Sequence, residues 1–152
     1  FFFCCFLATM ARFADASSVT AAINDVLAQG SFSGWVLVGY QDDKTLVLQG
    51  KGNGGVSELV QNIKEDEAQF CLVRIDDNTK GSLKETTRDI FIAWYGPGLS
   101  IIKRGKKTSD LGTVQKVMKP FHADITAVNK ENFNETNVRD KSMPLSGSHV
   151  ID

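Results

Sequence analysis

The feature that most constrains the fold is a run of five apolar residues, Ile90-Phe91-Ile92-Ala93-Trp94, which ends just before Gly96-Pro97-Gly98. The run is rich in β-branched and aromatic side chains, and the glycines and proline after it favour a turn, so it predicts a β-strand. Because apolar residues occupy both faces of this strand, both faces must be covered, which places it inside a sheet. The chain must therefore supply neighbouring strands, and helices on either side of them.

Patterns elsewhere in the chain supply both kinds of element. Apolar residues at helical spacing predict helices over 17–30, 56–63 and 111–119, and a weakly amphipathic one over 130–143 that Pro144 ends. Further strands are expected at 35–40, 44–50, 70–73 and 123–128, with a short strand at 99–102. We expect a polar loop at 76–87 and a basic loop at 103–107. This order predicts a single mixed α/β (α+β) domain in which helices cover a sheet.

The two ends of the chain are interpreted separately from this domain. Residues 1–9 are mostly apolar and precede Met10-Ala11-Arg12, which resembles a translation start. The apolar stretch is too short to span a bilayer and lacks the basic start of a secretory signal. We interpret 1–9 as a non-native or upstream extension, place the domain at 10–143, and expect 144–152 to form a disordered tail.

Composition narrows the classes of function. The net charge is −1, so no overall field draws the chain to nucleic acid or membrane, and a charged partner must be met by a local patch. The cysteines Cys4, Cys5 and Cys71 match no zinc site or disulfide framework, and Cys71 is expected to be a buried thiol in a reducing cytosol. No nucleophile stands in a recognisable catalytic arrangement. We therefore expect no metal, no cofactor and no enzymatic activity.

A glycine-rich stretch, Gly52-Asn53-Gly54-Gly55, precedes the second predicted helix. Exposed backbone amides in such a place can cradle an anion. However, neither the phosphate-loop spacing nor the dinucleotide-binding fingerprint is present. A flexible connection is favoured, and a small nucleotide- or anion-binding domain using Gly52–Gly55 is kept as an alternative.

The strongest local charge lies between Lys103 and Lys119. It comprises six cations: Lys103, Arg104, Lys106, Lys107, Lys116 and Lys119. In the helix predicted after Thr108 or Ser109, the apolar residues Leu111, Val114 and Met118 share one face, which leaves Gly112, Lys116 and Lys119 on the other. A solvated helix face explains such charge equally well. Nucleic acid is disfavoured because no aromatic residues interleave with the lysines, whereas an acidic protein surface fits the pattern.

Three stretches resemble the actin-depolymerising-factor homology family, and its coactosin branch in particular: residues 88–96, Lys103-Arg104 and residues 110–117. The resemblance extends from about Ser18 to Met143. It implies a mixed sheet of five or six strands between two pairs of helices, and binding along the side of actin filaments. By position, the resemblance puts contacts at Arg88, Lys103, Lys106, Lys107, Asp110, Thr113 and Lys116. Charge and helical phase add Arg104, Gly112 and Lys119.

Some residues depart from the pattern of the family. The basic run that coactosins carry before the central strand is diluted here to Lys84-Glu85-Thr86-Thr87, and the segment after Met10 lacks the regulatory serine of cofilin-like members. We therefore expect a monomeric, cytoplasmic protein of the cytoskeleton that modulates filaments without strong severing. Weak binding to monomeric actin and binding to phosphoinositides are further expectations, and a cofilin-like severing or depolymerising factor is the alternative.

Overall fold

The computed structural model describes residues 11–28, 30–76 and 86–152, which form one seven-stranded sheet and five helices. The strands are β1 (Arg12–Phe13), β2 (Gly34–Tyr40), β3 (Thr45–Gly52), β4 (Ala68–Asp76), β5 (Thr87–Tyr95), β6 (Ala123–Ala127) and β7 (Val150–Ile151). The helices are α2 (Ala16–Val26), α3 (Val56–Val60), α4 (Ile101–Ser109), α5 (Leu111–Met118) and α6 (Glu135–Lys141). The strand order is β1-β3-β2-β4-β5-β6-β7. The predicted α/β class is confirmed, with one or two more strands than expected.

The apolar run at 90–94 lies within β5, an interior strand. β5 pairs with β4 in antiparallel and with β6 in parallel orientation, and its residues from Arg88 to Tyr95 are all buried. The predicted hairpin is also present, because β2 and β3 pair in antiparallel orientation with a shift of register between Leu37 and Val38. The prediction that this run lies inside a covered sheet is therefore confirmed.

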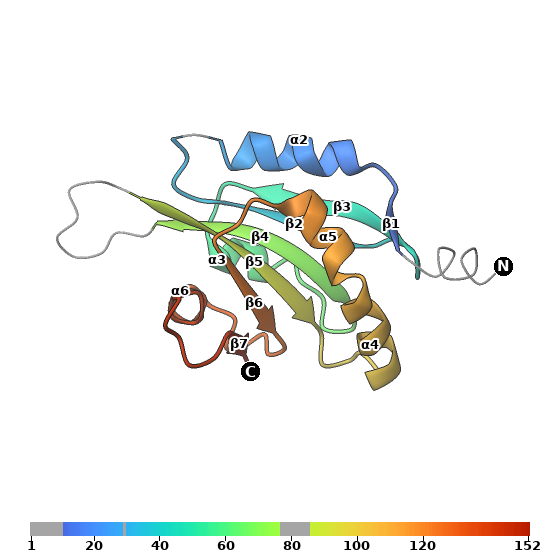
Figure 1. Ribbon diagram of the computed structural model, residues 1–152. Coiled ribbons are helices and arrows are strands. Elements are labelled where there is room, and N and C mark those ends of the chain that lie inside the picture. The colour runs from blue at the N-terminus through green and yellow to red at the C-terminus, as the bar shows by residue number, and fades with distance from the viewer. Residues whose placement is uncertain (1–10, 29, 77–85) are drawn as a thin grey trace.

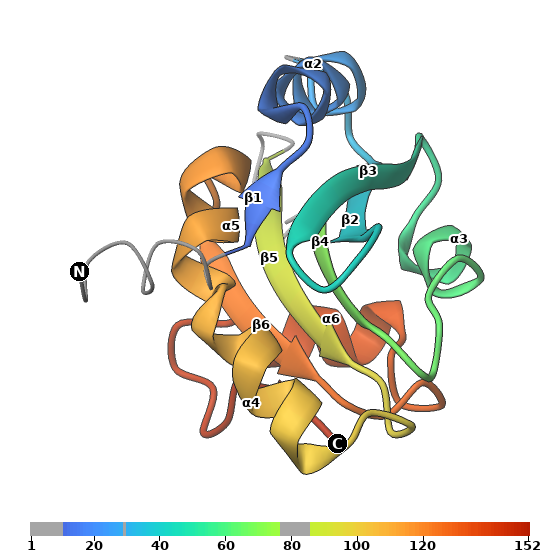
Figure 2. The ribbon, with the colours of Figure 1, turned by 90° about the vertical axis from the view of Figure 1, so that its right-hand side faces the viewer.

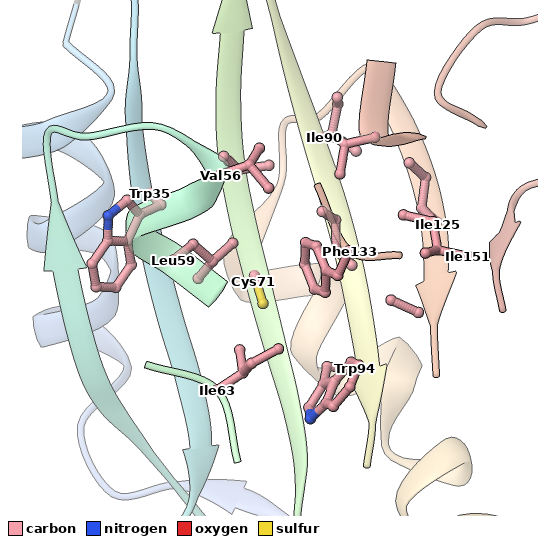
Figure 3. Packing of buried hydrophobic residues seen from close by; sticks show 14 of the residues in the cluster. Trp35, Val56, Leu59, Ile63, Cys71, Ile90, Trp94, Ile125, Phe133 and Ile151 are labelled. Carbon is pink, nitrogen blue, oxygen red and sulfur yellow. The ribbon is translucent and has the colours of Figure 1, made fainter. Parts of the chain in front are cut away.

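Helices cover both faces of the sheet (Figures 1 and 2). On one face α2 and α5 bury Val19, Val26, Val114 and Met118 against the odd-numbered residues of β5, such as Phe91. On the other face α3 and α6 lie over the even-numbered residues, which include Trp94. Figure 3 shows this second core, where the ring of Phe133 lies 6.0 Å from that of Trp94, centroid to centroid. The buried thiol of Cys71 belongs to the same cluster, as predicted.

The segment from Leu99 to Lys107 differs from its prediction. Neither the short strand at 99–102 nor the basic loop at 103–107 is present, because α4 begins at Ile101 and ends at Ser109. The Ser100 side chain caps this helix by accepting a hydrogen bond of 3.2 Å from the backbone N–H of Lys103. A serine cap followed by lysine and arginine, both good helix formers, outweighs the β-propensity of Ile101 and Ile102.

The carboxyl end also corrects an expectation, because it is part of the sheet. β7 pairs in parallel with β6, the backbone N–H of Val128 donates to the carbonyl of Ile151 at 2.9 Å, and Ile151 is only 2% exposed. A two-residue strand is too short to show the alternation of apolar and polar residues that marks a strand, which is why the sequence predicts a disordered tail at 144–152. The proposed extension at 1–9 and most of the polar loop at 76–87 lie outside the described residues. Within the described ranges, no helix is both long and apolar enough to cross a membrane.

Candidate functional site

Helix α4 stands outside the hydrophobic core. None of its residues is buried, and the isoleucines of its first turn are almost fully exposed, Ile101 to 90% and Ile102 to 74%. The helix runs alongside the sheet after β5 and continues into α5 (Figure 2). A nine-residue helix that buries none of its residues in the core contributes little to folding. Two adjacent exposed isoleucines are therefore better explained by a partner than by folding.

Cations on α4 rest on aromatic rings of the sheet. The Lys107 Nζ atom lies 3.6 Å from the centroid of the Tyr40 ring and donates to the backbone carbonyl of Asp43 at 3.0 Å. The Arg104 guanidinium carbon lies 5.3 Å from the centroid of the Tyr95 ring. Both distances are within the range of cation–π attraction. These two predicted contact residues therefore help to fix the helix, although both lie on its accessible surface.

Asp110 joins α4 to α5, and its carboxylate is held inside the domain. Asp110 is 8% exposed and accepts hydrogen bonds from the Tyr40 hydroxyl at 2.7 Å and from the backbone N–H of Ala11 at 3.4 Å. Burial, reinforced by the hydrogen bond to Asp110, raises the pKa of Tyr40, so this phenol remains a hydrogen-bond donor throughout the neutral range. The hydrogen bonds of Asp110 therefore stabilise the junction between α4 and α5, whereas the family resemblance predicts that this residue contacts a partner directly.

The outer face of the two helices carries most of the other predicted contact residues. Lys103, Lys106, Gly112, Lys116 and Lys119 are exposed, and Thr113 is partly exposed. On the inner face Val114 and Met118 are fully buried and Leu111 packs against the core, so the predicted division of the helix into two faces is confirmed.

A hollow of about 330 Å³ lies between α4 and the tip of the β2–β3 hairpin. Its lining residues are Asp43, Lys44, Lys103, Lys106, Lys107, Ser109 and Asp110. Four lysines against two carboxylates leave this hollow with a net charge of +2. In the part of the chain that the structure describes, no cluster of three or more metal-binding side chains is present.

Comparison with known proteins identifies the family. Residues 13–143 match the family of cofilin/tropomyosin-type actin-binding proteins. The chain belongs to this family. It is 29% identical over 141 residues to coactosin of Dictyostelium discoideum, an alignment that covers 89% of this chain and 93% of the relative.

Solved structures of the same family share the fold. Crystal structures of human coactosin-like protein superpose with a TM-score of 0.73 at 23% identity, covering 84% of this chain and 94% of that protein. The solution structure of mouse coactosin, described as an actin filament binding protein, gives a TM-score of 0.68 at 22% identity, covering 91% and 94% of the two chains. At these identities the structural likeness supports the fold alone.

Arg88, one of the predicted contact residues, lies apart from the others. Arg88 is 7% exposed, and its Nη1 atom lies 3.2 Å from the Met143 sulfur. The reason is the alternation of β5: even-numbered residues point to the α3–α6 face, whereas the cores of α2 and α5 lie on the opposite face. The structure therefore separates Arg88 from the cations of α4.

The glycine-rich loop is occupied by one of the chain's own carboxylates. A Cβ atom added at Gly52 or Gly54 would overlap a carboxylate oxygen of Glu58, which also accepts a 3.2 Å hydrogen bond from the Trp35 indole. The glycines therefore make room for Glu58, and its negative charge disfavours a bound anion. The loop also precedes a helix of only five residues, α3.

The sequence did not identify three residues of this surface. The sequence predicts a strand at Ile101 and Ile102, and Lys44 is brought to the hollow only by the hairpin. Helical numbering starting from a Ser100 cap would have placed both isoleucines in the first turn beside Lys103 and Arg104. No comparable pattern in the sequence indicates the position of Lys44, because it depends on the packing of α4 against the hairpin.

Proposed function

We propose that this family member binds the side of actin filaments through the outer faces of α4 and α5, and modulates filament dynamics without strong severing. The observation that carries the proposal is the composition of α4: an exposed isoleucine pair, followed by cations, on a helix that adds nothing to the core. The description of mouse coactosin as an actin filament binding protein supports the same choice of partner. In this proposal the chain acts by binding alone and catalyses no reaction.

Two interactions support binding at this surface: attraction between charges, which acts before contact, and burial of apolar side chains, which acts on contact. Lys103, Lys106 and Lys116 are exposed and can steer the domain toward an acidic surface before contact. Burial of Ile101 and Ile102 in a complementary apolar cleft would then stabilise the complex by about 1.5–3 kcal/mol per side chain. Charge would thus set the rate of encounter, and the isoleucines would slow dissociation.

This function places the protein in the cytoplasm, at the cytoskeleton, as a monomer. The same surface, with the five cations of α4 and α5 and with Lys119 just after α5, would also bind monomeric actin more weakly. Arg104 and Lys107 would contribute less than Lys103 and Lys106, because they already lie against Tyr95 and Tyr40.

Co-sedimentation with filamentous actin tests the proposal directly. The double variant Ile101→Ala/Ile102→Ala should bind at least about a hundredfold more weakly, because each truncation removes most of an apolar side chain at about 0.8 kcal/mol per methylene and every 1.4 kcal/mol is tenfold in affinity. Leu145→Ala is the matched control, since Leu145 is 98% exposed in the segment after α6. Equal pelleting of the double variant and the wild type would rule out the isoleucine pair of α4 as part of the binding surface.

The contribution of charge to filament binding is tested with a separate pair of variants. Lys103→Ala/Lys106→Ala should weaken pelleting, and the effect should shrink as salt screens charges beyond about 8 Å at physiological ionic strength. Lys51→Ala, on β3 and paired with Asp25 at 2.8 Å, should leave pelleting unchanged. Fluorescence microscopy of immobilised filaments then separates the two modes of action: a rising number of filament ends would favour the cofilin-like alternative.

Phosphoinositide binding is a second candidate for the same helix. An apolar pair next to cations in the first turn of α4 suits the boundary between headgroups and acyl chains. Flotation with vesicles containing phosphatidylinositol 4,5-bisphosphate tests it, with phosphatidylcholine vesicles as the control. Flotation that Ile101→Ala/Ile102→Ala abolishes would support this candidate, and recovery of all the protein in the bottom fraction would exclude it.

A further inference from the structure

Ser109 occupies an unusual position at the end of α4. It is exposed, it lines the hollow that contains Lys44, Lys103, Lys106 and Lys107, and its hydroxyl donates to the Lys106 carbonyl at 2.6 Å. Because the hydroxyl is neutral, it forms no ion pair with the lysines around it. The net positive charge of the hollow is therefore not balanced by the unmodified side chain.

The charge of the hollow matches that of a phosphoserine. Its net charge of +2 faces the charge of about −1.5 to −2 that a phosphoserine carries near neutral pH. The Asp110 carboxylate would interfere little, because its two oxygens accept from Tyr40 and Ala11. Space of about 330 Å³ beside the serine leaves room for a phosphoryl group.

The residues before Ser109 suit a kinase that selects basic substrates. Lys107 and Lys106 stand two and three positions before it, the kind of charge pattern by which protein kinases choose a serine. Thr108 has the same lysines one and two positions before it, and its hydroxyl is tied to the Arg104 carbonyl at 2.8 Å. Both residues are exposed, and unwinding the end of α4 in the active site of a kinase would expose no buried residue of that helix.

We propose that Ser109 is a regulatory phosphorylation site whose phosphate is held by the lysines of the hollow and weakens filament binding. In the reaction, Ser109 Oγ bonds to the γ-phosphorus of a nucleoside triphosphate, the bond from that phosphorus to its bridging oxygen breaks, and a nucleoside diphosphate leaves. The hydroxyl proton passes to the base of the kinase. The regulatory half of this proposal rests on the proposed function, and the modification itself does not.

The effect on binding follows from competition for the same cations. A phosphate in the hollow would pair with Lys103 and Lys106, which the filament would otherwise meet. It would also remove the hydrogen bond from Ser109 to the Lys106 carbonyl, at the carboxyl end of α4, where negative charge is disfavoured. Both changes act on the surface that carries the proposed function, and both lower affinity.

Phosphorylation itself is tested without actin. The purified chain is incubated with ATP and the catalytic subunit of cAMP-dependent protein kinase, and the modified residue is located by mass spectrometry. We expect close to one phosphate per chain on Ser109, lost in Ser109→Ala and retained in Thr108→Ala. Absence of phosphate, or its placement on Thr108 or another residue, would overturn the assignment.

Two further measurements test the lysine hollow and the regulation. Phosphorus NMR should show the second phosphate pKa below its ordinary value of about 6, and Lys44→Ala/Lys103→Ala, which keeps the lysines two and three positions before Ser109, should restore that value. An unshifted pKa would show that the lysines do not hold the phosphate. In co-sedimentation the phosphorylated chain should bind filaments about tenfold more weakly than the unmodified chain, the loss expected when a few charge-assisted contacts are removed.

The outcomes separate this proposal from the proposed function. If the unmodified chain does not pellet, filament binding fails as a function while the mass spectrum and the phosphate pKa still decide the modification. If the unmodified chain pellets and the phosphorylated chain pellets equally well, filament binding stands and the regulatory role of Ser109 is wrong.

Discussion

Tyr40→Phe isolates the hydrogen bond that fixes the junction between α4 and α5. The substitution keeps the ring on which Lys107 rests and removes only the hydroxyl that donates to Asp110 at 2.7 Å. A hydrogen bond to a charged group contributes about 1.5–3 kcal/mol, and the low end applies here because Tyr40 is only partly buried. The remaining donor to the carboxylate, the N–H of Ala11, is 3.4 Å away and compensates poorly. We therefore expect a loss of about 1.5 kcal/mol in the free energy of unfolding.

Urea denaturation followed by tryptophan fluorescence measures this loss, and calorimetry should show a melting temperature lower by about 3–6 °C. Because burial and Asp110 raise the pKa of Tyr40, the difference from wild type should stay constant from about pH 6 to about pH 9. The cycle of Tyr40→Phe, Asp110→Asn and the double variant should return a coupling energy of similar size. A change below about 0.5 kcal/mol in Tyr40→Phe would refute the role assigned to this contact. Filament binding should change less than about threefold, because the cation–π contact persists.

Three further predictions concern positions where the structure departs from the sequence-based expectation. Gly54→Ala should lower the free energy of unfolding by about 1–3 kcal/mol, because the new Cβ must displace Glu58, and ATP should produce no thermal shift in either protein. Ile151→Ala should cost about 2–4 kcal/mol by urea denaturation, as for a core residue, whereas Leu145→Ala should be neutral; an equal effect of the two would return residues 144–152 to a disordered tail. Arg88→Ala should destabilise the fold by about 2 kcal/mol and leave pelleting of the folded fraction intact, and a loss of binding without a loss of stability would place Arg88 on the partner surface.

The fold could be predicted from the sequence wherever the pattern of apolar residues was long enough to identify a strand or a helix. The continuous apolar run of β5 requires cover on both faces, and the helical phase of Val114 and Met118 indicates which side of α5 faces the core. Edge strands of two residues, such as β7, give no such pattern, and only their pairing in three dimensions defines them. Two adjacent isoleucines at 101–102 have high β-propensity, which the serine cap outweighed.

The candidate site was predictable in its charge but not in its geometry. A cluster of lysines in the sequence does not reveal that Lys107 lies on Tyr40, or that the carboxylate of Asp110 points inward. Both facts depend on contacts between residues about 70 positions apart in the chain. The burial of Arg88 was likewise not evident from the sequence, because the family resemblance gives its position in the chain and not the surroundings of its side chain.

The independence of α4 from the core has a consequence for how defects in this protein would be detected. Because none of its residues is buried, most substitutions there should leave the native population, and therefore the cellular abundance, unchanged. Chaperones and proteases respond to unfolded chains and would not remove such variants. A chain altered at Ile101 would therefore accumulate at a normal level while its proposed binding is lost, and measuring the amount of protein would not reveal the defect.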